Sequence, residues 1–69
     1  AVRRTQAAVD SMPPHLQAVH AYLLQGLTNK RIALLLDLSQ NTVRLYVSEI
    51  LQQLGYRSRT ELLAAHITR

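Results

Sequence analysis

Cysteine is absent from this 69-residue chain, which excludes a disulfide framework and a thiolate metal site. No apolar run approaches the roughly 20 residues of a membrane-spanning helix, and the N-terminus lacks the charged-then-apolar order of a signal peptide. So short a chain forms one small domain, and with 48% hydrophobic residues a helical core held by apolar packing is feasible. We expect a cytoplasmic protein with no membrane partner.

Patterns for catalysis and metal binding are also missing. The four acidic residues are scattered, and no serine lies in a His-carboxylate pattern. His15 and His20 do not share one helical face, and His66 is far along the chain. Both glycines stand alone, which excludes a glycine-rich phosphate loop. The sequence therefore predicts no enzyme, no cofactor and no metal site.

Positive charge, by contrast, is plentiful. Eight Lys and Arg residues against four Asp and Glu give a net charge of +4 and a pI near 10.4. In so small a domain this balance favours a polyanionic partner, although a merely solvated basic surface is the alternative. Position favours the partner, because Lys30 and Arg31 open one expected helix and Arg44 lies on the free face of the next.

The first part of the chain predicts one helix. Residues 1–11 show no clear apolar period and are interpreted as a linker or a frayed helical arm. A helix follows Pro13 and Pro14, because proline is accepted in a helix's first turn, and Gly26 ends it in a left-handed cap. Its apolar stripe consists of Leu16, Val19, His20, Leu23, Leu24 and Leu27.

Three further helices are expected. Thr28 and Ser39 are the predicted N-caps of a second and a third helix, separated by a tight turn near Asp37. The third helix ends at Gly55, and a capping box of Ser58 and Glu61 starts a short fourth one. The predicted fold is all-α.

The third helix, about residues 40–54, has two different faces. Its apolar residues are spaced for one side of a helix and must be buried: Val43, Val47, Ile50, Leu51 and Leu54. The opposite side can donate, accept and make an apolar contact, which suits the edges of base pairs: Asn41, Arg44, Leu45, Ser48 and Gln52.

The run GLTNKRIALLLDLSQNTV, followed at the right spacing by Ile50, Leu54-Gly55 and Arg59-Thr60-Glu61-Leu62, resembles the LuxR/FixJ/GerE-type helix-turn-helix domain. The resemblance covers residues 12–67 and places a domain at residues 12–69. It implies a three-helix core with a C-terminal dimerisation helix. It also implies a bacterial, nucleoid-associated regulator that binds double-stranded DNA, as the output half of a response regulator or quorum sensor with a possible missing N-terminal receiver or sensor domain.

A third helix in the major groove would direct Arg44 to guanine acceptors, Leu45 to a thymine methyl and Ser48 to either a donor or an acceptor. The family has its DNA contacts at these positions. The expected base-contacting residues are Asn41, Arg44, Leu45 and Ser48, and the expected phosphate-contacting residues are Thr28, Asn29, Lys30, Arg31, Ser39, Thr42 and Tyr46.

Departures from the family predict weak binding by one copy. The family often has a basic residue at Asn41, a His at Tyr46 and a Lys at Gln53, and fewer cations release fewer counterions. A homodimer would compensate by engaging both halves of an inverted repeat. The resemblance implies that the dimer forms through an apolar stripe on the fourth helix, made of Leu63, Ala64 and Ile67.

Two other readings stay open. One is a protein-interaction module with a weakened DNA face, in which Leu34, Leu35 and Leu63 contact a partner; isolated exposed leucines would need no such explanation. The other is a promoter-reading domain of the sigma-factor type, against which the fourth helix argues.

Overall fold

The structure, a computed structural model, describes residues 8–68, with the backbone alone for residues 67 and 68. Its main helices are α2 (Pro14–Leu24), α3 (Asn29–Leu36), α4 (Gln40–Leu54) and α5 (Arg59–Thr68). Residues 8–11 form a further helical segment, and residues 8–68 contain no strand. The all-α prediction is confirmed, while the interpretation of residues 1–7 lies outside the described part of the chain.

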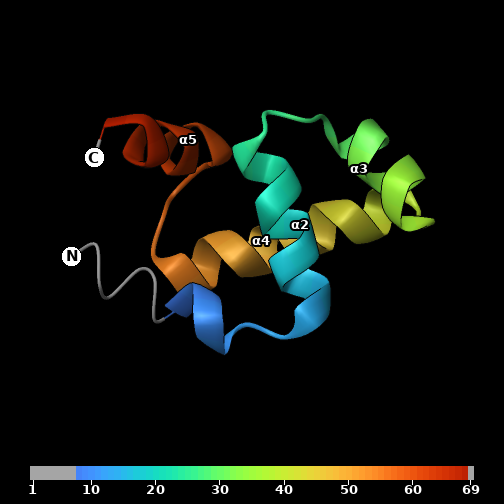
Figure 1. Cartoon of the computed structure of the whole chain (residues 1–69), viewed down its shortest axis with the longest axis horizontal. Coiled ribbons are helices and arrows are strands. Elements are labelled where there is room, and N and C mark those ends of the chain that lie inside the picture. Colours follow the sequence, from blue (N-terminus) through green and yellow to red (C-terminus); the bar gives the residue numbers. More distant parts are fainter. Residues whose placement is uncertain (1–7, 69) are drawn as a thin grey trace.

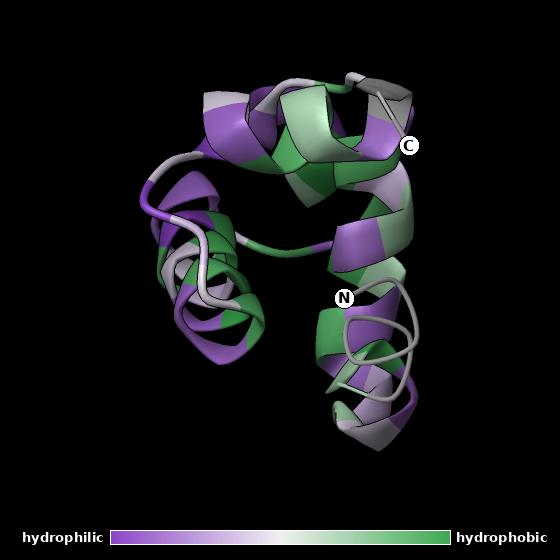
Figure 2. Ribbon diagram, turned by 90° about the vertical axis from the view of Figure 1, so that its left-hand side faces the viewer, coloured by the Kyte–Doolittle hydropathy of each residue, from purple (hydrophilic) through white to green (hydrophobic). Residues whose placement is uncertain are grey.

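The long helix α4 lies at the centre of the molecule, and α2 crosses it (Figure 1). Both α2 and α3 pack against α4, and α5 contacts α2 and α4. The hydrophobic segments of the helices turn towards one another (Figure 2). The buried core draws on every main helix: Met12, Leu16, Val19, Leu23, Ile32, Ala33, Val43, Val47, Ile50 and Leu62.

Within two residues of the end of α2, α3 and α4, the chain has a residue in the left-handed conformation, which turns it into the next segment. Gly26 and Gly55 have φ of 82° and 80°. Asp37, with φ 56°, is the non-glycine residue in this conformation among residues 8–68. The apolar residue after each turn is partly buried and donates its backbone N–H to an earlier carbonyl: Leu27 to Tyr22, Leu38 to Ala33 and Tyr56 to Leu51.

The predicted N-caps of α3 and α4 are confirmed. The Thr28 hydroxyl accepts from the N–H of Arg31 at 3.2 Å, and the Ser39 hydroxyl accepts from the N–H of Thr42 at 3.1 Å. These bonds fix where both helices begin and hence how they cross.

The capping box of α5 differs from the expected form. Ser58 Oγ accepts from the N–H of Glu61 at 3.1 Å, as predicted. The Glu61 carboxylate, however, accepts from the N–H of Arg57 at 3.1 Å, one residue before the N-cap. The carboxylate thus holds the preceding loop as well as the start of the helix.

Candidate nucleic-acid interface

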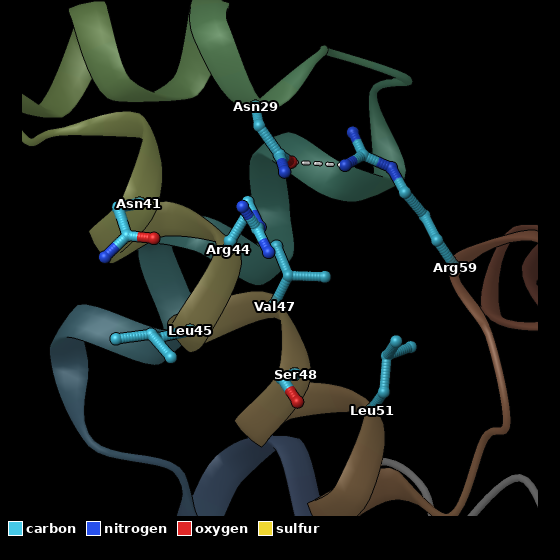
Figure 3. A pocket seen from close by; sticks show the side chains of 8 residues that line it. All are labelled: Asn29, Asn41, Arg44, Leu45, Val47, Ser48, Leu51 and Arg59. Carbon is cyan, nitrogen blue, oxygen red and sulfur yellow. Dashed lines mark hydrogen bonds between the residues drawn. The ribbon is translucent and has the colours of Figure 1, made fainter.

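The outward face of α4 presents the four side chains expected to contact bases. Val43, Val47 and Ile50 are buried on the inner side, so the residues spaced between them point outwards. All four are exposed, and Leu45 leaves 59% of its surface accessible. They project from α4 around one shallow concavity (Figure 3): Asn41, Arg44, Leu45 and Ser48.

Two side chains from other helices complete this concavity. Asn29 reaches it from the first turn of α3, and Arg59 from the first residue of α5, while Val47 and Leu51 line it from α4 (Figure 3). Amide, guanidinium and hydroxyl groups therefore surround a small apolar surface. Such a set can bind base edges, a thymine methyl and phosphate oxygens.

The residues expected to contact phosphates lie along the first turns of α3 and α4. Lys30 and Arg31 are exposed at the start of α3, outside the concavity. At the start of α4 the Ser39 hydroxyl donates to Thr42 Oγ1 at 2.9 Å. Because that bond uses the only hydroxyl proton of Ser39, the Thr42 hydroxyl is the free donor of this pair.

Tyr46 lies on a different side of α4, away from the concavity. It is partly buried, and its ring is 4.8 Å from that of His15 on α2, with the two planes tilted by 52°. His15 was assigned no role from the sequence. The contact holds the Tyr46 ring against the start of α2.

Arg59 is the residue of the concavity that sequence reasoning missed. Its Nη1 donates to Oδ1 of Asn29 (Figure 3), and its Nη2 donates to the carbonyl oxygen of Leu27. The available signal was its place in the Arg-Thr-Glu-Leu run, which carried the family resemblance. That run gave no hint of a partner 30 residues earlier in the chain.

The proposed dimer stripe is described in part. Leu62 is buried in the core at 3% exposure, as expected, and Ala65 is partly buried. Leu63 is partly buried, Ala64 is exposed, and the side chain of Ile67 lies outside the described residues. The prediction of a dimer through this stripe is therefore untested by the single chain.

The described residues offer no metal site and no membrane-spanning helix. They contain no group of three or more His, Asp or Glu side chains able to hold a metal ion, and no described helix has the length and apolar character needed to cross a membrane. On α2, burial lowers the pKa of His20, and the nearby His66 lowers it further.

Comparison with known proteins now adds to this geometry. The family model described as "Bacterial regulatory proteins, luxR family" matches residues 17–65. The two-component response regulator PprB of Pseudomonas aeruginosa is 43% identical over 54 residues, which are 78% of this chain and 20% of that protein. No solved structure gives a significant match.

Two other relatives cover the same part of the chain. The probable transcriptional regulator ycf29 of Porphyra purpurea is 40% identical over 52 residues, 75% of this chain and 25% of that protein. The nitrate/nitrite response regulator protein NarL of Escherichia coli is 33% identical over 57 residues, 83% of this chain and 26% of that protein. The chain thus spans about a quarter or less of the length of these relatives.

Proposed function

Because the chain belongs to the luxR family of bacterial regulatory proteins, we propose that it recognises specific double-stranded DNA sequences as part of a transcriptional regulator, with α4 in the major groove. The observation that carries this proposal is the concavity on α4. Asn41, Arg44, Leu45 and Ser48 surround it from a single helix face, and every one of them is exposed. The face is thus free for a ligand and has the side chains that base edges require.

Each side chain has a distinct part in base recognition. The Arg44 guanidinium donates to the O6 and N7 acceptors of guanine, and the Asn41 carboxamide pairs with the N6 and N7 of adenine. The Ser48 hydroxyl donates or accepts, and Leu45 packs on a thymine methyl. Leu45 is a large apolar side chain at the surface, which a partner with an apolar group would cover.

Contacts with the phosphates set the docking angle. The proposed residues are Thr28, Asn29, Lys30, Arg31, Ser39, Thr42 and Tyr46. These contacts contribute affinity and register without sequence information. In support, these residues lie at the start of α3, in the first turn of α4, and, for Tyr46, on the side of α4 that contacts His15. Because Ser39 and Thr28 also cap their helices, their substitution would change stability as well as binding.

We propose that two copies bind an inverted repeat through α5 stripes of Leu63, Ala64 and Ile67. One copy offers few phosphate-facing cations, so its own affinity is expected to be weak. PprB and NarL are named as response regulators, and the whole protein is proposed to couple this domain to a receiver or sensor domain. Such a regulator acts on the nucleoid in the bacterial cytoplasm.

The deciding experiment is selection of bound duplexes from a random DNA pool with the 69-residue chain and its Arg44→Ala variant. We expect the wild type to enrich an inverted repeat. Arg44→Ala should bind it about 10- to 100-fold more weakly and lose preference at one base pair, as expected for loss of a bidentate guanine contact of about 1–3 kcal/mol. Arg57→Ala is the matched control, because it removes the same charge from an exposed loop position.

An interaction module is the second candidate, favoured by the 69% and 53% exposure of Leu34 and Leu35 on α3. In that case the chain would enrich no DNA sequence, and Arg44→Ala would leave its partner bound. Equal salt-sensitive binding of all duplexes would likewise contradict sequence recognition by this chain alone.

A further inference from the structure

We propose that Arg59 is a positioning residue for the DNA backbone: its guanidinium fixes the carboxamide of Asn29 so that the amide nitrogen faces the concavity and donates to a phosphate oxygen. The inference rests on the proposed DNA-binding function. It adds to that function a residue of α5, an element otherwise assigned only to dimerisation.

The hydrogen bonds determine which way the Asn29 amide points. Arg59 Nη1 donates to Oδ1 of Asn29, and Nη2 donates to the carbonyl oxygen of Leu27. A guanidinium has only donors, so the atom of Asn29 that faces it must be the oxygen. The amide nitrogen therefore lies on the other side of the carboxamide, away from Arg59.

This orientation decides what Asn29 can bind. Asn29 is partly buried and lines the same concavity as Arg44 (Figure 3). Phosphate oxygens only accept hydrogen bonds, so they require the nitrogen of the amide and are repelled by its oxygen. An unrestrained carboxamide would sample both orientations, and fixing it in one reduces the cost of binding.

The planar fork of Arg59 is suited to this task. Its two terminal nitrogens hold two acceptors, the side chain of Asn29 at the start of α3 and the backbone carbonyl of Leu27 in the α2–α3 connection. The start of α5 is thereby joined to the start of α3. A lysine would keep the charge but could not reproduce the rigid two-point contact.

The first test measures binding of the duplex recovered by selection, by fluorescence anisotropy. Arg59→Ala should weaken binding about five- to tenfold, the effect of losing one hydrogen bond of ordinary strength, and by a similar factor on mismatched duplexes, because phosphate contacts carry no sequence information. Arg57→Ala removes an equal charge and should change binding less than about twofold, since that charge is screened. Arg59→Lys should recover only part of the loss.

The second test separates positioning from structural support. Asn29→Asp keeps an oxygen for Arg59 and places an acid in the first turn of α3, so thermal stability should rise. It also replaces the amide donor by a carboxylate, so DNA binding should fall at least tenfold. A purely structural role for the pair would move stability and binding in the same direction. Ala21→Glu, at an exposed position of α2, makes the same change in net charge and should leave binding nearly unaltered.

A double-variant cycle completes the design. If Arg59 acts only through Asn29, the chain with both Arg59→Ala and Asn29→Ala should bind like Asn29→Ala alone. Losses that multiply would overturn the proposal. The proposal would also be overturned if Arg44→Ala impaired DNA binding while Arg59→Ala left it unchanged. This outcome would leave the DNA-binding function standing. A wild-type chain that binds no duplex overturns both.

Discussion

At the scale of single residues, His20 links stability to pH. Its side chain lies on the side of α2 that faces the core, with 9% of its surface exposed. Burial, assisted by His66, holds the pKa of His20 below the ordinary value of 6.5. The unfolded chain therefore takes up this proton at a higher pH than the folded chain does. The stability contributed by neutral His20 is complete above about pH 6.5 and decreases as the pH falls toward the lowered folded-state pKa.

We expect the urea midpoint, followed by circular dichroism, to fall between pH 7.5 and pH 5. His20→Leu should remove most of this decrease, because leucine is apolar, suits the buried position and does not titrate. His66→Gln should leave most of it, since burial is the larger cause of the shift. If the decrease survived in His20→Leu and disappeared in His66→Gln, His20 would not be its cause.

At the scale of the elements, the end of α3 has a backbone conformation that is unfavourable for a non-glycine residue. Asp37 holds φ 56° at the turn between α3 and α4, a conformation that glycine adopts without cost. The free energy of unfolding should rise by about 0.5–1 kcal/mol in Asp37→Gly, read as a higher urea midpoint with an unchanged slope.

The matched control is the end of α4. Gly55 has φ 80°, and a Cβ added there would meet no atom within 4 Å, so any loss comes from backbone conformation rather than crowding. Gly55→Ala should destabilise by about 1 kcal/mol. If the two substitutions shifted the midpoint in the same direction, the left-handed turns would not be the controlling feature.

The helices could be predicted because their signals are local. Apolar spacing located the core faces of α2 and α4, and Thr28 and Ser39 located two helix starts. For residues 1–11 the sequence left a linker and a frayed helical arm open, and residues 8–11 are helical. The choice could not be made from the sequence, because Val9 and Met12 pack against distant parts of the core. The hydrogen bond from the Arg57 N–H to Glu61 was not predicted, because a capping box joins this side chain to the N–H of the N-cap residue, one position later.

The candidate site divides along the same line. Helical period alone grouped five residues on the outward face of α4. Four of them line the concavity, Asn41, Arg44, Leu45 and Ser48, while Gln52 does not. Arg59 and His15 could not be added, since their contacts with Asn29 and Tyr46 join different helices. Contacts of that kind depend on crossing angles that no short stretch of sequence encodes.

At the scale of the whole molecule, the positions of α4 and α5 predict the spacing of the proposed inverted repeat. The longest extent is 33 Å, with α4 through the middle and α5 towards one end (Figure 1). A two-fold axis through the α5 stripes would separate the two α4 helices by about one molecular length. One turn of B-DNA is about 34 Å, so the half-sites of the inverted repeat should be centred about one turn apart.

The dimer itself is tested by Ala64→Glu on the exposed side of α5. In a two-fold interface the same patch meets its copy, so each substitution brings two carboxylates together. Affinity for the inverted repeat should fall about 100-fold, the lower end of what avidity supplies, while binding to an isolated half-site should not change. Ala21→Glu on α2 adds the same charge away from the stripe and should affect neither duplex. Equal losses on the full site and the half-site would instead mean that α5 acts on each copy separately, and the dimer would have to form through another surface.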